Sequence, residues 1–170
     1  MGDALTPPLL TPLEPTTVEL LTHTADFTLS APVPSTAQNT IALQLAASYR
    51  FGNDGSEPVT VILKMAEQQY NGATPEIRLA VGDTPLTLFR TEGVGYTAQI
   101  QIGADARTTV DLYYTITVDN LPLPSFSYNA AGLSAWPGNP SVRVSVVLPQ
   151  PQLVLKVGFM LPRMIGDTHK

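Results

Sequence analysis

The sequence contains no cysteine and only two histidines, so several kinds of chemical site are excluded or rare from the start. Without cysteine there are no disulfides, no thiolate zinc sites and no cysteine nucleophiles. His169 is the second residue from the end, where side chains rarely hold a fixed geometry. The chain has neither a Gly-x-Ser-x-Gly motif nor a glycine-rich phosphate-binding motif, which disfavours serine hydrolases and nucleotide-binding enzymes.

Charge is also scarce. Charged residues make up 14% of the 170 residues, against about 25% in ordinary soluble domains. The nine Lys and Arg residues are scattered singly and the net charge is −5, which is unsuited to binding a nucleic-acid backbone. No apolar run approaches the roughly 18 residues of a membrane span. We therefore expect no nucleic-acid partner and no membrane-spanning segment in this chain.

The first 15 residues, MGDALTPPLLTPLEP, lack the basic and apolar regions of a secretory signal. This leaves two alternatives: a cytoplasmic protein, or a chain that begins after a removed signal. The composition of the chain favours the second, so we expect an extracytoplasmic or cell-surface location.

Apolar and polar residues alternate along most of the chain, as is typical of half-buried β-strands. The alternation predicts strands over 18–29, 41–51, 59–65, 76–81, 86–90, 96–102, 108–118, 142–148 and 152–161. In the first of these the alternation changes phase, which predicts a β-bulge near Leu20 and Leu21. The polar turn 52–58 predicts a hairpin between the second and third strands.

About nine strands, each with one apolar face, bury those faces by packing sheet on sheet or by closing a barrel. The long connections 66–75 and 120–140 favour Greek-key crossovers over uniform hairpins. We therefore predict an all-β fold, an antiparallel β-sandwich of Ig-like or jelly-roll type. The expected organisation is an extended Pro-rich arm over 1–15, a single sandwich domain over 16–163 and a flexible tail over 164–170.

Two segments carry a resemblance to a known group. The first is Tyr49-x-Phe51-x-Asn53-x-Gly55-x-x-x-Val59-Thr60-Val61-x-Leu63, and the second runs from Ser127-Tyr128-Asn129 through Ala135-Trp136-x-Gly138 to Leu148-Pro149. Over residues 41–150 the chain resembles immunoglobulin-like sandwich modules of secreted and surface-anchored bacterial proteins, a poorly characterised group. The resemblance implies a sandwich fold and an extracytoplasmic setting, and it carries over no catalytic residue.

The long connection 121–140 is the most distinctive candidate for a binding site. It holds Phe126, Tyr128 and the only tryptophan, Trp136. Aromatic side chains on a long ordered loop can stack on sugar rings or anchor a protein partner. Alternatively, a tryptophan beside proline and glycine plugs the open end of a sandwich core.

Other candidate sites have simpler explanations. His23 shares a strand face with Ala25 and Phe27, which predicts a hydrogen-bonded strand histidine. The loop Asn53–Glu57 has oxygen ligands suited to Ca²⁺ but lacks the spacing of a calcium loop. The carboxylates mostly fall at turns or on outward-facing strand positions. We therefore predict no catalytic residue, no metal and no cofactor.

The composition favours a noncatalytic structural or adhesive module that binds a protein partner or a second copy of itself. Thr-rich outer strand faces and the outward Ile62, Val147 and Val154 suit such contacts. The alternative is a carbohydrate-binding module that uses Trp136, Tyr128 and Phe126. A hydrolase built on unassigned carboxylates is a third hypothesis.

Overall fold

The structure is a computed structural model that describes residues 6–30, 40–67, 70, 73–119, 126–147 and 157–160. The predicted all-β class is confirmed, because these residues are mostly in strands and the short 3₁₀ helix η1 (Ala130–Ala135) is the one helix among them. The strands are β1 (Thr11–Pro12), β2 (Glu19–Leu29), β3 (Thr40–Asn53), β4 (Val59–Met65), β5 (Glu76–Val81), β6 (Thr84–Pro85), β7 (Phe89–Thr91), β8 (Gly95–Ile102), β9 (Ala106–Asp119), β10 (Phe126–Asn129), β11 (Ser141–Val147) and β12 (Val157–Met160).

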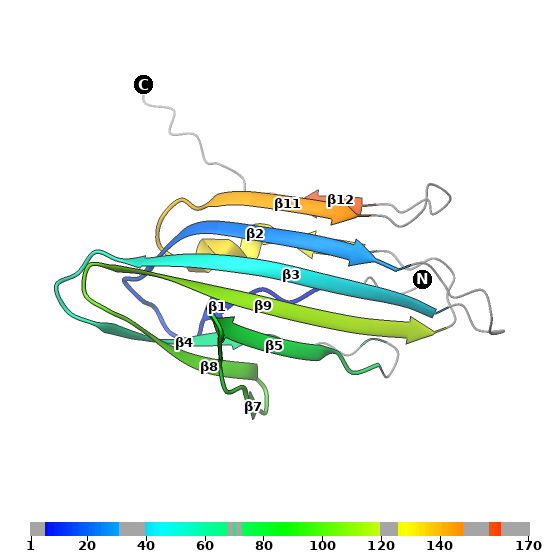
Figure 1. Cartoon of the computed structure of the whole chain (residues 1–170), viewed down its shortest axis with the longest axis horizontal. Helices are drawn as coiled ribbons and strands as arrows, with labels where there is room; N and C mark the ends of the chain where they lie inside the picture. Colours follow the sequence, from blue (N-terminus) through cyan, green and yellow to red (C-terminus); the bar gives the residue numbers. More distant parts are fainter. Residues whose placement is uncertain are drawn as a thin grey trace, which may run out of the picture.

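Six strands form the larger sheet in the order β11-β2-β3-β9-β5-β6, and most of them run side by side across Figure 1, from β11 at the top to β5 below. β3 and β9 pair along their full lengths, as expected for the two longest alternating segments. Their inward side chains are buried wherever the structure describes them, which confirms the predicted strand faces.

The predicted bulge is confirmed in β2. Its pairing with β3 shifts register between Leu20 and Thr22, so Leu20 and His23 both point to the buried side. A single extra residue is what allows the two apolar phases of this segment to share one core.

β11 pairs with β2 in parallel, whereas the sequence predicted an antiparallel arrangement throughout. The direction of β11 is set just before it begins, because the Leu20 N–H donates to the Pro137 carbonyl at 3.1 Å. The chain therefore approaches β11 beside the start of β2, and both strands run the same way.

Four strands form the smaller sheet in the order β1-β4-β8-β7, and β10 pairs with β12 in a parallel two-stranded sheet. One hydrophobic cluster contains buried side chains from both the six-stranded sheet and the four-stranded sheet. Its members include Leu43, Leu45 and Phe51 of β3, Leu112 and Tyr114 of β9, Leu63 of β4, and Ile100 and Ile102 of β8. No helix in the described part of the chain has the length and hydrophobicity needed to cross a membrane.

The hairpin predicted across residues 52–58 is wrong. β3 pairs with β2 and β9, whereas β4 pairs with β1 and β8, so the turn carries the chain from one sheet to the other. Asn53, which is almost fully buried, organises this crossing. Its Nδ2 donates to the carbonyls of Glu57 at 2.8 Å and Gly103 at 3.0 Å, and its Oδ1 accepts from the Gly55 N–H at 3.0 Å.

The second crossing between the sheets, from β8 to β9, passes through Gly103. The Asp105 N–H donates to the Gly55 carbonyl at 3.0 Å, so the two crossings are joined directly as well as through Asn53. The buried side chain of Asn53 therefore stabilises both connections between the sheets, from β3 to β4 and from β8 to β9.

Within the Pro-rich beginning of the chain, residues 6–13 pack against the rest of the protein. Leu10 is fully buried, Pro7 and Pro8 are buried, and β1 pairs with the edge of β4. Residues 6–13 are therefore part of the folded structure.

We expect Asn53→Ala to lower the free energy of unfolding by about 2 to 3 kcal/mol, because it leaves buried carbonyls without donors. Urea unfolding measures this. The control is Asn129→Ala, which removes one exposed cap bond to the Ala131 N–H and should cost about 1 kcal/mol. Equal losses in the two variants would contradict the role given to Asn53.

Candidate functional site

Trp136, the first of the predicted binding residues, is buried directly after η1. Its ring packs on Phe51 with the centroids 4.6 Å apart, and its Nε1 donates to the Leu10 carbonyl at 2.9 Å. The indole thus contacts both β3 and the Pro-rich segment. Stacking on a sugar needs an exposed ring face, which this arrangement does not offer.

Tyr128, on β10, is also buried. Its ring meets Phe27 edge-on at 5.0 Å, and its Oη lies 2.5 Å from His23 Nε2. Phe126 is the first residue of β10, but its side chain lies outside the described residues. Two of the three predicted residues therefore meet in one buried aromatic cluster, together with His23, Tyr49 and Phe51.

Two hydrogen bonds and one ring contact link this cluster. The Leu10 N–H donates to Tyr49 Oη at 3.2 Å, and Tyr128 Oη is hydrogen-bonded to His23 Nε2. The Tyr49 ring joins the two, because its centroid lies 4.3 Å from that of the His23 ring. Which of Tyr128 and His23 donates depends on the ring nitrogen that carries the His23 proton.

Burial keeps these groups neutral. It lowers the pKa of His23 to about 4, although the nearby Ser48 backbone partly opposes the shift. Nδ1 makes no hydrogen bond of normal geometry, so a charge on this ring would have little compensation. Burial also raises the pKa values of Tyr49 and Tyr128 above the ordinary value. The prediction of a buried, hydrogen-bonded strand histidine is confirmed.

The loop considered for calcium uses its polar groups on itself. Asn53 bonds within the two crossings, and Asp54 pairs with Arg107 at 2.6 Å. In the described part of the chain, no group of three or more His, Asp and Glu side chains is placed to hold a metal ion.

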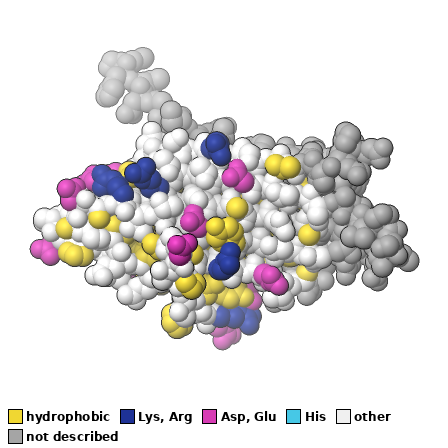
Figure 2. Space-filling model, viewed as in Figure 1, with side chains coloured by type: hydrophobic (Ala, Val, Ile, Leu, Met, Phe, Trp, Pro, Cys, Tyr) yellow, Lys and Arg dark blue, Asp and Glu magenta, His cyan; other side chains and the backbone are white. Residues whose placement is uncertain are grey.

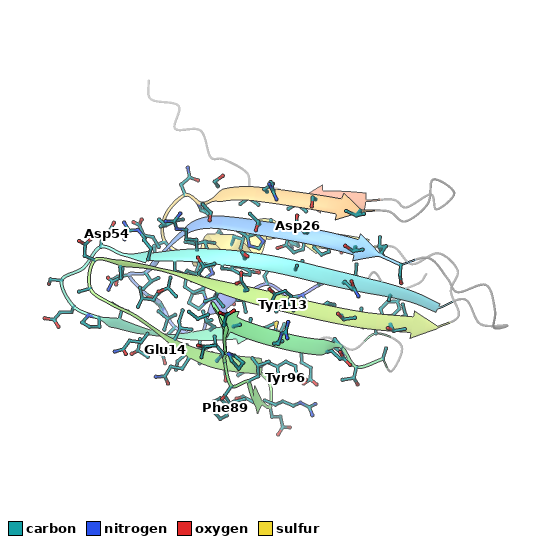
Figure 3. The ribbon with its side chains drawn as sticks, viewed as in Figure 1. Glu14, Asp26, Asp54, Phe89, Tyr96 and Tyr113 are labelled. Atoms are coloured by element: carbon teal, nitrogen blue, oxygen red, sulfur yellow. The ribbon has the colours of Figure 1, made fainter. Side chains whose placement is uncertain are left out.

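Sequence reasoning missed the centre of the outer face of the six-stranded sheet. There the register aligns Ser145, Asp26, Ala46, Tyr113 and Arg78 in one row across β11, β2, β3, β9 and β5. Tyr113 is 42% exposed, and the Arg78 guanidinium lies 4.7 Å from its ring centroid. Figure 3 labels Asp26 and Tyr113 on this row. The signal in the sequence was an aromatic residue at an outward position of a Thr-rich strand.

Two shallow hollows adjoin this ring. One, of about 360 Å³, is lined by Glu76, Ile77, Arg78, Tyr113 and Thr115. The other, of about 350 Å³, is lined by Arg78, Ala80, Gly82, Asp83, Pro85 and Tyr113. Tyr113 and Arg78 line both hollows.

The rest of this outer face combines short polar side chains with charged ones. Ser48 Oγ donates to Asp111 at 2.5 Å, Ser145 Oγ donates to Asp26, and Arg143 lies 3.8 Å from Asp26. Arg50 and Glu76 also point outward and are exposed. Figure 2 shows hydrophobic side chains near the centre of this side of the molecule, with basic and acidic side chains beside them.

Comparisons with known proteins inform the fold. No protein-family model matches the sequence, and no curated protein matches it either. The structure is similar to the crystal structure of a "putative nutrient binding protein" from Legionella pneumophila, with a TM-score of 0.59 and 10% sequence identity. The match covers 81% of this chain and 51% of the other, so this chain spans about half the length of that protein. At this identity the likeness shows a shared fold and nothing of the ligand.

We expect Trp136→Ala to lower the free energy of unfolding by about 3 to 5 kcal/mol, because it leaves a cavity and frees the Leu10 carbonyl. The matched control is Tyr113→Ala, an exposed aromatic whose loss should cost less than about 1 kcal/mol. Denaturant unfolding of both variants measures the difference. A Trp136→Ala variant as stable as the control would show that the indole is not part of the core.

The pKa of His23 predicts a loss of stability in mild acid. The folded pKa of about 4 lies below the ordinary value of 6.5, so the unfolded chain takes up the proton first. Stability is complete above pH 6.5 and falls as the pH drops from 6.5 to 4. Between pH 7 and pH 5 we expect a loss of about 2 kcal/mol from this group.

Urea unfolding at several pH values measures this loss against His23→Gln, which cannot titrate. Other groups titrate alike in both proteins, so the difference between the two curves isolates His23. Parallel curves over this range would contradict the buried neutral imidazole.

Proposed function

We propose that this chain is a noncatalytic structural or adhesive β-sandwich module of an extracytoplasmic or surface protein. In this proposal the two larger sheets form an Ig-like or Greek-key sandwich. The module binds a protein partner or a second copy of itself through the outer face of the six-stranded sheet. The shared core of the two sheets supports the fold, and the exposed Tyr113 on the outer face supports the role.

The observation that carries the proposal is the exposed ring of Tyr113 at the centre of the broad outer face of the six-stranded sheet. Tyrosine offers a large contact area at a small entropic cost and is enriched at protein interfaces. Arg78, placed over the ring, supplies a second residue type that interfaces favour. Short Thr, Ser and Ala side chains around them leave the face flat enough for a second protein surface to approach.

Exposed apolar residues away from the centre agree with this role. Val147, at the end of β11, is 56% exposed and lies on the same outer face, and Ile62, on the other sheet, is 39% exposed. Both were expected to point outward, whereas Val154 lies outside the described residues.

The carbohydrate-binding alternative uses a different part of the molecule. It needs exposed faces on Trp136 and Tyr128, and both side chains are buried. The segment 126–136 would have to move away from the core before a sugar could stack there. No observation on the described residues favours that movement, so we place the proposed interface at Tyr113.

Light scattering during size-exclusion chromatography tests the sheet-face interface. We expect a concentration-dependent dimer, and we expect Ala46→Arg to weaken it by roughly tenfold, because a long charged side chain beside Tyr113 must be desolvated on contact. The matched control is Gln101→Arg on the outer face of the smaller sheet, which should leave association unchanged. A strictly monomeric protein that also captures no protein partner through Tyr113 would contradict the proposal.

A further inference from the structure

Residues 6–13 lie against the rest of the protein as a peptide lies in a binding groove. We call these residues the N-terminal segment and the surface that holds them the segment groove, which is formed by Tyr49, Ser127, Gly132, Trp136 and the edge of β4. The groove is on the inner side of the six-stranded sheet, away from Ala46 and Tyr113. Binding in the groove is therefore independent of association through the outer face.

The groove holds the backbone of the segment at Leu10 from both sides. Tyr49 Oη accepts from the Leu10 N–H at 3.2 Å, and Trp136 Nε1 donates to the Leu10 carbonyl at 2.9 Å. Both aromatic side chains are buried, so these bonds are protected from water. These two bonds bind the main chain at Leu10, so the same segment from a second copy of the chain would form them equally well.

Further along, the segment adds to a sheet edge. Thr11 and Pro12 pair antiparallel with Lys64 and Leu63 of β4, and the Leu13 N–H donates to the Ile62 carbonyl at 2.8 Å. Addition of an extended peptide to an exposed strand edge is a recurrent mode of peptide recognition.

Side chains of the segment fit matching places in the groove. Leu10 is fully buried in the core cluster, and Thr6 Oγ1 lies 3.0 Å from Ser127 Oγ. Leu9 passes close to Gly132 of η1: a Cβ placed on that glycine would lie 3.1 Å from Leu9 Cδ1. A single Cβ at position 132 therefore requires the end of the Leu9 side chain to shift by a few tenths of an ångström, and a full leucine side chain there would press further into the segment.

The link between the segment and the rest of its own chain is weak. Glu14 and Pro15 are exposed, and the chain enters no further strand until β2 begins at Glu19 in the other sheet. An open hollow of about 360 Å³ lies between residues 14–17 and residues 59–62 of β4. This connection can take a different path without disturbing the contacts of residues 6–13.

We propose that the segment groove is an exchangeable docking site whose occupant in assemblies of this protein is the N-terminal segment of a second copy. The segment is the sequence whose fit to the groove the structure describes, at Thr6, Leu9, Leu10 and the pairing with β4. Exchange between copies preserves those contacts and the cover over the edge of β4, so only the connection at 14–17 changes. Copies linked in this way each complete the core of a neighbour.

Disulfide trapping in the full chain tests the exchange, since the protein has no cysteine of its own. Thr6→Cys in one preparation and Ser127→Cys in another place the two thiols within bonding reach only when the segment of one chain fills the groove of the other. After mixing under mild oxidant, we expect roughly tenfold more mixed-disulfide dimer than with Thr117→Cys on the outer face, because docking raises the effective concentration of the thiols.

Three further substitutions show that the groove is responsible. Gly132→Leu in the Ser127→Cys chain should reduce the mixed dimer to the level of the Thr117→Cys control. Ala131→Leu, which adds the same side chain on the exposed side of η1, should leave it unchanged. Ala46→Arg should also leave it unchanged, which separates this proposal from association through the outer face.

The double variant Thr6→Cys with Ser127→Cys establishes that the pair can form a bond within one chain. If that bond forms and the mixed dimer stays at the control level, the segment belongs permanently to its own chain and the proposal is overturned. A fluorescent peptide of residues 6–13, TPPLLTPL, gives an independent measurement by anisotropy with the full chain.

We expect the peptide to bind and expect Gly132→Leu to abolish its binding. If the double variant forms no internal bond, this result decides: binding that is sensitive to Gly132→Leu supports exchange, and no binding overturns it. Peptide binding without any mixed dimer, when the internal bond does form, would show a different occupant and would overturn the assignment to a second copy.

Discussion

The burial of Leu10 between two aromatic side chains joins three parts of the chain that lie far apart in sequence. Its N–H is bound by Tyr49 of β3, and its carbonyl is bound by Trp136, which follows η1. Tyr49 also packs against His23 of β2, whose Nε2 bonds to Tyr128, so the same network also fixes β10 against the large sheet. Because every member is buried and uncharged at neutral pH, the network adds order to this end of the core without leaving a charge in it.

The chain also has to cross from one sheet to the other without exposing the core. The side-chain amide of Asn53 stabilises both of these crossings. Asn53 has donors and an acceptor on one short side chain, which allows it to bond both crossings at once. An aspartate of the same shape would lack the donors, and a serine would not reach. The residue therefore has a structural role that its position in a polar, calcium-like loop does not reveal.

The sequence predicts the strands and their buried faces well, because the alternation of apolar and polar residues indicates directly which side of a strand is buried. β3 and β9 were located with their inward residues, and the phase change in β2 revealed its bulge. Alternation does not report partners: residues 52–58 have the composition of a hairpin turn, yet they bridge two sheets. The parallel direction of β11 was equally hidden, since it depends on the contact between Leu20 and Pro137. Phe126, Tyr128 and Trp136 stood out in the sequence as aromatic residues, but only long-range contacts show that Tyr128 and Trp136 face the core.

Both proposed modes of association keep the edge of β4 covered. Contact through the face around Tyr113 leaves the edge of β4 as it is, covered by the N-terminal segment. Exchange of that segment also keeps the edge covered, because each groove is refilled as it is emptied. An uncovered edge would invite unspecific strand pairing, so a protein that rearranged by simply releasing the segment would risk aggregation. Exchange avoids that state in the final assembly and leaves the outer face free. Both contacts can therefore exist in one assembly, with the segment linking neighbours through their cores and the face meeting a further surface.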